Sequence, residues 1–118
     1  MSWLSLFGKS KPAKVKAGAR TAPPPSSARL NNVLLRLDHF SISIKLRERI
    51  AQGLYERQEA KCILQAGRQG DRLLEIGAGI GYISCLAALS GNFEAITVVE
   101  ANPELIPLIE LAQKSLLI

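Results

Sequence analysis

Several residue types are scarce in this chain of 118 residues, and each scarcity excludes a class of protein. The two cysteines, Cys62 and Cys85, lie far apart in apolar helical stretches, so they form neither a metal-ligand spacing nor a disulfide framework. We expect both to be buried thiols in a reducing cytosol. No apolar run approaches the roughly 18–20 residues that span a bilayer. The apolar start is very short and precedes its lysines, which argues against a signal peptide, so we expect a cytoplasmic protein.

Acidic residues are missing from the beginning of the chain. Residues 1–30 contain six basic and no acidic side chains, whereas residues 31–118 contain nine basic and ten acidic ones. Residues 8–29 are rich in Lys, Ala, Pro and Ser, a composition that cannot bury a core and predicts a disordered linker. We therefore assign residues 1–30 to a basic tail that could contact nucleic acid or an anionic membrane weakly. Removal of residues 1–29 is expected to leave the fold intact.

Residues 31–70 are predicted to form a helical N-terminal extension. Isoleucine and serine alternate over residues 41–44, which suits a short strand or an extended arm. Apolar residues then recur every four positions from Lys45 to Gly67, the period of an amphipathic helix. Gly53 either kinks this segment or divides it into two helices. His39 is the only histidine, and a structural or exposed role is weighed against a substrate-side role.

Residues 71–118 alternate apolar strands with helices. The expected elements are a strand at Leu73–Ile76, a helix at Gly81–Ser90, a strand at Ala95–Val99 and a final helix. Asn102 is expected to cap this last helix, with Pro103 at its first position. Pro107 is expected to distort its opening turns. The continuous apolar character of the first strand predicts a parallel strand that is covered on both faces. This order is the opening of an α/β fold, the first two βα units of an incomplete, Rossmann-like doubly wound sheet.

Two strands make a poor sheet by themselves, because much of their apolar surface and both edges lack a neighbour. We therefore expect a truncated or fragmentary chain that self-associates through an exposed sheet edge.

The most informative motif lies between the first strand and its helix, where residues 71–81 read Asp-Arg-Leu-Leu-Glu-Ile-Gly-Ala-Gly-Ile-Gly. Glycine lets the backbone turn tightly and approach a ligand, and a strand that leads through such a loop into a helix forms a nucleotide-binding site. The NAD fingerprint G-x-G-x-x-G would place its third glycine at Tyr82, but this chain has Gly81 instead. The carboxylate of Glu75 disfavours a pyrophosphate and favours a ligand that carries an amine and a sulfonium. Glu100 follows at about the spacing, roughly 20 residues, at which a carboxylate meets ribose hydroxyls.

The segment Glu75–Gly81 matches the E/D-x-G-x-G-x-G loop of class I S-adenosylmethionine-dependent methyltransferases at every fixed position. The chain from about residue 33 onward resembles that superfamily. The turn Val98-Val-Glu-Ala-Asn-Pro103 also resembles the superfamily. Within it, the element Gly53-Leu-Tyr-Glu56 resembles the FkbM family. One departure is Gly79, where that family often has Asn.

The resemblance implies an enzyme that uses S-adenosyl-L-methionine to methylate a small molecule or glycan, most simply on oxygen. It implies that the cofactor is bound by Glu75 at its amine, the backbone of Gly77, Ala78, Gly79 and Gly81, Glu100 at its ribose and Ala101 beside its adenine. Tyr55 and Glu56 either line the same pocket or form an ordinary half-buried helix face. No catalytic residue is assigned, because acceptor binding and proton removal in such enzymes come largely from later strands, and the chain alone is expected to be inactive.

Two other functions stay open. One is a non-catalytic cofactor-binding or interaction module. The other is an NAD-binding dehydrogenase domain, which the early third glycine disfavours.

Overall fold

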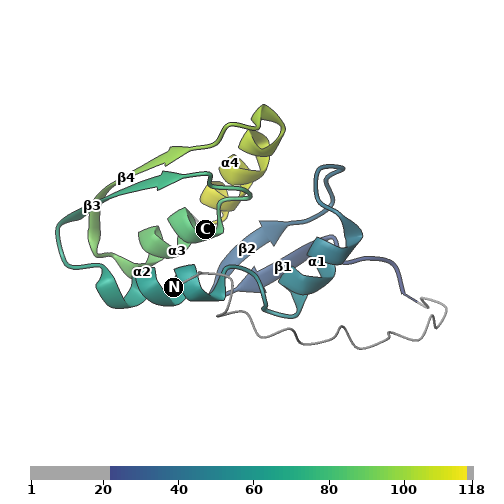
Figure 1. Ribbon diagram of the computed structural model, residues 1–118, viewed down its shortest axis with the longest axis horizontal. Helices are drawn as coiled ribbons and strands as arrows, with labels where there is room; N and C mark the ends of the chain where they lie inside the picture. Colours follow the sequence, from purple (N-terminus) through teal and green to yellow (C-terminus); the bar gives the residue numbers. More distant parts are fainter. Residues whose placement is uncertain (1–21, 117–118) are drawn as a thin grey trace, which may run out of the picture.

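The computed structural model describes residues 22–116, which form a mixed α/β structure with two two-stranded sheets (Figure 1). Its elements in chain order are β1 (Ser27–Leu30), β2 (Val33–Arg36), α1 (Ile44–Ala51), α2 (Arg57–Ala66), β3 (Asp71–Ile76), α3 (Tyr82–Ser90), β4 (Phe93–Val99), the 3-10 turn η2 (Pro103–Leu105) and α4 (Ile106–Ser115). No helix in this range is long and apolar enough to cross a membrane. Most of the predicted basic tail, up to residue 21, lies outside the described residues.

The first sheet is an antiparallel hairpin of β1 and β2. Asn31 and Asn32 connect the two strands, and both adopt left-handed backbone conformations with φ of 46° and 66°. Two left-handed central residues make the turn whose twist matches that of paired strands, and Asn is among the few residues that tolerate them. The assignment of residues 27–30 to a disordered tail is therefore wrong, because this turn chemistry folds them back onto β2.

The hairpin and the residue that follows β2 contribute several fully buried side chains to the core. Val33, Leu35 and Leu37 have no exposed surface. The strand predicted at residues 41–44 is absent, because Ile42 lies in a bend and Ile44 begins α1. Buried and more exposed residues instead alternate in β2, whose four residues are too few to stand out in the sequence.

The helical segment is divided as the sequence allows. Ser43 accepts a hydrogen bond from a backbone N–H in the first turn of α1, so α1 begins with a side-chain cap. Gly53 has a φ of 75° and separates α1 from α2, and Gly67 ends α2. Gly53 was predicted either to kink this segment or to divide it, and the division into two helices is confirmed.

The second sheet pairs β3 and β4 in parallel, with α3 as the connection between them. Figure 1 shows α3 along one face of this sheet. Both strands begin earlier than predicted, because Asp71 already pairs with Phe93. The register between the strands shifts between Asp71 and Arg72. Gly91 ends α3 in a left-handed conformation, as expected for a helix C-terminal cap.

The other face of the β3–β4 sheet carries large apolar side chains that are exposed. Leu74 is 59% exposed, Ile76 is 77% exposed and Val99 is 47% exposed. The prediction that the first strand is covered on both faces is therefore wrong for the described residues, since the helices pack on one face only. Self-association through the free edges of this sheet stays a prediction.

The last helix begins as the sequence predicts. The Asn102 side chain accepts a hydrogen bond from the backbone N–H of Glu104 at 3.1 Å, and Pro103 starts a 3-10 turn. Pro107 lies in the first turn of α4, which follows this 3-10 turn and where proline is tolerated. α4 then packs against β2 and α3, so the hairpin and the βαβ unit share one core.

Candidate functional site

A glycine loop, residues 77–81, joins β3 to α3 at the carboxyl end of the parallel strands. The backbone N–H of Gly77 donates to the carbonyl oxygen of Val99 at 2.8 Å, which ties the loop to the end of β4. The N–H of Gly81 donates to the carbonyl of Ala78 at 3.0 Å and closes the turn. The loop therefore presents its backbone at the strand ends, where α/β sheets bind ligands.

Two of the loop glycines are required by space as well as by conformation. Gly81 has a φ of 88°, and a Cβ atom there would lie 3.2 Å from the Cα of Ile109 in α4. Gly79 has a φ of 60°, and a Cβ atom there would lie 3.0 Å from the hydroxyl oxygen of Tyr55. Tyr55 and α4 thus approach the loop too closely for a larger residue to fit without movement.

We expect Gly81→Ala to destabilise the chain more than Gly77→Ala. Both positions are left-handed, which costs a residue with a Cβ about 1–2 kcal/mol. Only the Gly81 substitution also forces α4 backbone to move, which adds about 1–3 kcal/mol, because nothing lies within 4 Å of a Cβ at Gly77. Urea unfolding measures both variants, and an equal loss of stability would contradict this packing.

Glu100 follows β4 and holds the glycine loop with its side chain. One carboxylate oxygen accepts a hydrogen bond from the N–H of Gly79 at 2.6 Å, and the other accepts one from the N–H of Asn102 at 2.9 Å. The N–H groups of Asn102 and Gly79 lower the pKa of Glu100, so the carboxylate stays ionised. The sequence predicted that Glu100 binds the ribose of the cofactor, but it did not predict the hydrogen bond between Glu100 and Gly79.

Glu75 lies within β3 on the face that meets α3, where it is half-buried. Its Oε2 atom is buried without a hydrogen-bond partner. Burial, and to a smaller extent the charge of Glu100, raises the pKa of Glu75, while the side chain and backbone of Ser84 oppose the shift. The site therefore contains a carboxylate oxygen that lacks a donor.

A second buried carboxylate oxygen without a partner belongs to Glu56, in the turn before α2, whose carboxyl also has a hydrogen bond with the Tyr55 side chain. Glu56 has a left-handed φ of 46°, and the oxygen without a partner is its Oε2 atom. Burial first, and then the charge of Glu75, raises the pKa of Glu56 to about 7. Burial likewise raises the pKa of the neighbouring Tyr55, so its hydroxyl stays protonated at neutral pH. The structure thus brings Tyr55 and Glu56 to the glycine loop and Glu75, in a turn rather than on a helix face.

These raised pKa values predict that the ligand-free chain is more stable at pH 5.5 than at pH 8. Folded Glu56 binds its proton up to about pH 7, whereas an unfolded Glu loses it near pH 4.5. Its stabilising contribution is therefore present below about pH 4.5 and is lost as the pH rises through about 7. We expect an effect on the order of 1 kcal/mol, since water screens the half-exposed carboxyl. Thermal unfolding at the two pH values measures this difference. Glu56→Gln should reduce the pH dependence, whereas Glu94→Gln, which removes an exposed acid of β4, should not.

The remaining predicted residues have different environments. Ala78 is fully buried and Ala101 is exposed. Cys85 is buried, and burial together with Glu75 raises the pKa of its thiol to about 11. Cys62 is exposed on α2, so the expectation of a buried thiol is wrong at that position.

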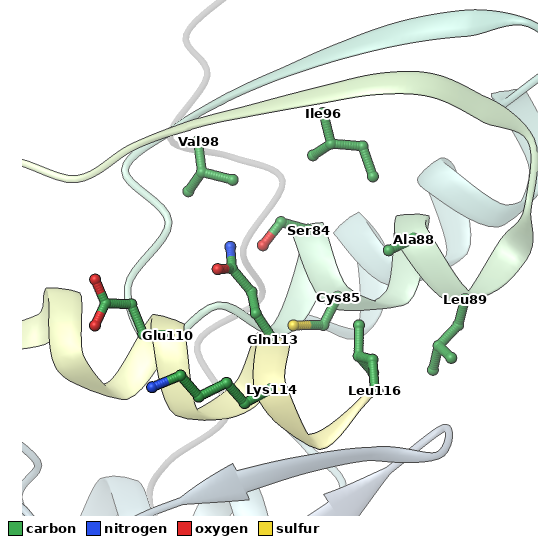
Figure 2. A pocket seen from close by; sticks show the side chains of 10 residues that line it. All are labelled: Ser84, Cys85, Ala88, Leu89, Ile96, Val98, Glu110, Gln113, Lys114 and Leu116. Atoms are coloured by element: carbon green, nitrogen blue, oxygen red, sulfur yellow. The ribbon is translucent and has the colours of Figure 1, made fainter. Parts of the chain in front are cut away.

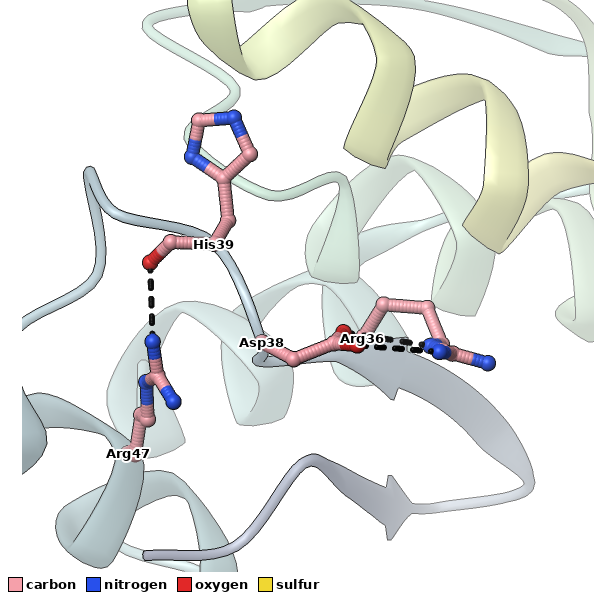
Figure 3. Close-up of polar contacts among 4 residues, drawn as sticks. All are labelled: Arg36, Asp38, His39 and Arg47. Carbon is pink, nitrogen blue, oxygen red and sulfur yellow. Dashed lines mark hydrogen bonds and ion pairs between the residues drawn. The ribbon is translucent and has the colours of Figure 1, made fainter.

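His39 lies in the segment between β2 and α1 and takes part in local loop contacts (Figure 3). Its Nδ1 atom accepts a hydrogen bond from the N–H of Ser41 at 3.1 Å, and its carbonyl oxygen accepts one from the guanidinium of Arg47 at 3.0 Å. An exposed ion pair between Arg36 and Asp38, at 3.1 Å, precedes it. These contacts agree with a structural role for His39.

A cavity of about 610 Å³ lies between α3, β4 and α4 (Figure 2). It is lined by Ser84, Cys85, Ala88, Leu89, Ile96, Val98, Glu110, Gln113, Lys114 and Leu116. None of the residues predicted for the cofactor lines it, although Ser84 and Cys85 of its lining lie close to Glu75.

Comparisons with known proteins do not assign this site. A scan against protein-family models found no match, and a search of curated proteins found no relative. The function is therefore argued from the residues and their geometry.

Proposed function

We propose that this chain binds S-adenosylmethionine at the glycine loop and belongs to a Rossmann-like, FkbM-like class I methyltransferase. The observation that carries the proposal is the pair of buried carboxylate oxygens without a donor, one on Glu75 and one on Glu56. Buried polar atoms in proteins are rarely left unpaired, because an unmade hydrogen bond costs about 1–3 kcal/mol. A ligand with a cationic amine beside the loop would satisfy both oxygens.

The residues present fit this cofactor. Its amino group would be held by Glu75 and Glu56, and its sugar would lie against the backbone of residues 77–81. The ionised Glu100 carboxylate accepts from Gly79 at one oxygen and from Asn102 at the other. Because a carboxylate has about four lone-pair sites, it can also accept a bond from a ribose hydroxyl. The bound cofactor supplies an activated methyl group, and the chain contributes its orientation.

The arrangement of the strands also supports a Rossmann-like sheet. β3 and β4 are parallel and connected through α3, and the glycine loop and Glu100 follow their carboxyl ends. Ligands bind at that edge in doubly wound sheets. The acceptor class, a small molecule or glycan, rests on the resemblance alone.

Isothermal titration of the chain with S-adenosylhomocysteine tests the proposal. We expect binding that strengthens from pH 6 to pH 8, because Glu56 must ionise to pair with the amine. Methylthioadenosine, which lacks the amino-acid portion, should bind more weakly and without this pH dependence. Tighter binding of NAD than of S-adenosylhomocysteine would contradict the assignment.

A methyl-transfer assay separates the enzyme from the second candidate, a non-catalytic cofactor-binding module. Binding of the cofactor with no transfer to any glycan or small-molecule acceptor would favour the module. Transfer by the 118-residue chain would contradict the expectation that it is inactive by itself.

A further inference from the structure

We propose that the N-terminal hairpin positions the glycine loop through a hydrogen bond between Asn31 and Tyr82. Asn31 and Tyr82 are positioning residues, since neither belongs to the loop that would touch the ligand. The consequence for cofactor affinity rests on the proposed function, whereas the effect on the loop itself does not.

The bond joins two distant parts of the chain. The side-chain amide of Asn31, in the turn between β1 and β2, donates to the hydroxyl of Tyr82 at 2.7 Å across 51 positions of sequence. Tyr82 is the first residue of α3 and directly follows Gly81, the last residue of the loop. Its side chain is only 2% exposed, so its hydroxyl depends on a protein partner.

Contacts continue from Tyr82 to the centre of the loop. The rings of Tyr82 and Tyr55 pack with their centroids 6.0 Å apart. The hydroxyl of Tyr55 stands against Gly79, whose N–H is bonded to Glu100. A change in the position of Tyr82 would therefore reach the Gly79–Glu100 bond through one intervening ring.

The loop needs such support because of its composition. Its three glycines all have positive φ, and glycine loses more conformational freedom on ordering than any other residue. Contacts that order the loop before a ligand arrives lower the entropy lost on binding. α4 supplies one such contact at Gly81 through Ile109, and the hairpin supplies another through Asn31.

Asn31 meets two requirements at once. Its φ of 46° favours Asn or Gly, and its bond to Tyr82 requires a side-chain donor. Asn32, with a φ of 66°, has the same backbone requirement but an exposed side chain with no described hydrogen bond. The adjacent asparagine is therefore a matched control.

The test compares Asn31→Gly, Tyr82→Phe, the double variant and the control Asn32→Gly in the full chain. Each glycine keeps the left-handed turn, and phenylalanine keeps the buried ring. Amide hydrogen exchange of Gly79 and Gly81, measured by NMR without ligand, should accelerate about two- to tenfold in the first two variants. The exchange rate in the double variant should equal that of the single variants, and the rate in the Asn32→Gly control should stay close to that of the unchanged chain. The affinity for S-adenosylhomocysteine should fall by a similar factor.

Equal effects of Asn31→Gly and Asn32→Gly would overturn the proposal, because only the first removes a contact with Tyr82. Acceleration that is uniform over the whole chain would also overturn it, since it would show a general loss of stability. Unchanged exchange with intact cofactor binding would overturn the positioning role and leave the proposed function standing. Faster exchange at the loop in a chain that binds no S-adenosylhomocysteine would support the positioning role and refute the proposed function.

Discussion

Glu100→Ala is expected to weaken binding of S-adenosylhomocysteine by about 1.5–3 kcal/mol, equal to roughly 10- to 150-fold in the dissociation constant. The ionised carboxylate has two roles that the substitution removes together. It holds the N–H groups of Gly79 and Asn102, and in the proposed complex it also accepts hydrogen bonds from the ribose. Isothermal titration at pH 8, above the pKa of about 7 of Glu56, measures the loss.

Two further variants separate these contributions. Glu100→Gln should lose less than the alanine variant, because it keeps one carbonyl oxygen that can accept from Gly79 or from the ribose. Glu104→Ala removes an exposed acid four positions away, so it matches the change in charge without touching the loop. An unchanged dissociation constant in a folded Glu100→Ala chain, or an equal loss in Glu104→Ala, would refute the role of Glu100.

A chain that begins at residue 31 is expected to be less stable than one that begins at residue 22 by about 3 kcal/mol or more. The shorter chain lacks β1, all four residues of which pair with β2. It also loses the packing of Ala28 and Leu30 against the core and the bond from the N–H of Leu37 to the carbonyl of Ser26. This loss is a large part of the roughly 5–15 kcal/mol that stabilises a typical domain.

Urea unfolding of the two chains measures the difference, which isolates residues 22–30. Arg29→Ala, on the exposed face of β1, is the matched control and should change stability by less than about 0.5 kcal/mol. Equal stability of the two chains would show that the hairpin is not part of the folded unit. The expectation that residues up to 29 can be removed freely is replaced by this prediction, because β1 is paired.

The sequence alone determined the features that depend on local backbone requirements. Glycines at 77, 79 and 81 indicated a tight turn, and all three have a positive φ, which glycine adopts readily. Gly53 indicated the division between α1 and α2, and Asn102 the start of the last helical segment. These features were readable because one residue type satisfies each of them within a few positions of chain.

The turn Asn31–Asn32 carried the same kind of local signal, but the proline-rich composition before it hid the short strand β1. The limits of β3 and β4 were also missed, because Asp71 and Arg72 pair although they are polar, and Glu94 separates Phe93 from the apolar run of β4. Composition and periodicity are judged over a window of several residues, and the four-residue strand β1 is shorter than that window.

Only the tertiary structure decided which distant residues meet. Glu100 reaches Gly79 across 21 positions, and Asn31 reaches Tyr82 across 51. Burial and, after it, the charge of Glu75 raise the pKa of Glu56, and both depend on how the turn before α2 packs against the glycine loop. Packing also decided that one face of the β3–β4 sheet is exposed, although both faces are apolar. Hydrogen bonds, burial and charge interactions act through space, so their partners are set by the packing of the elements rather than by position along the chain.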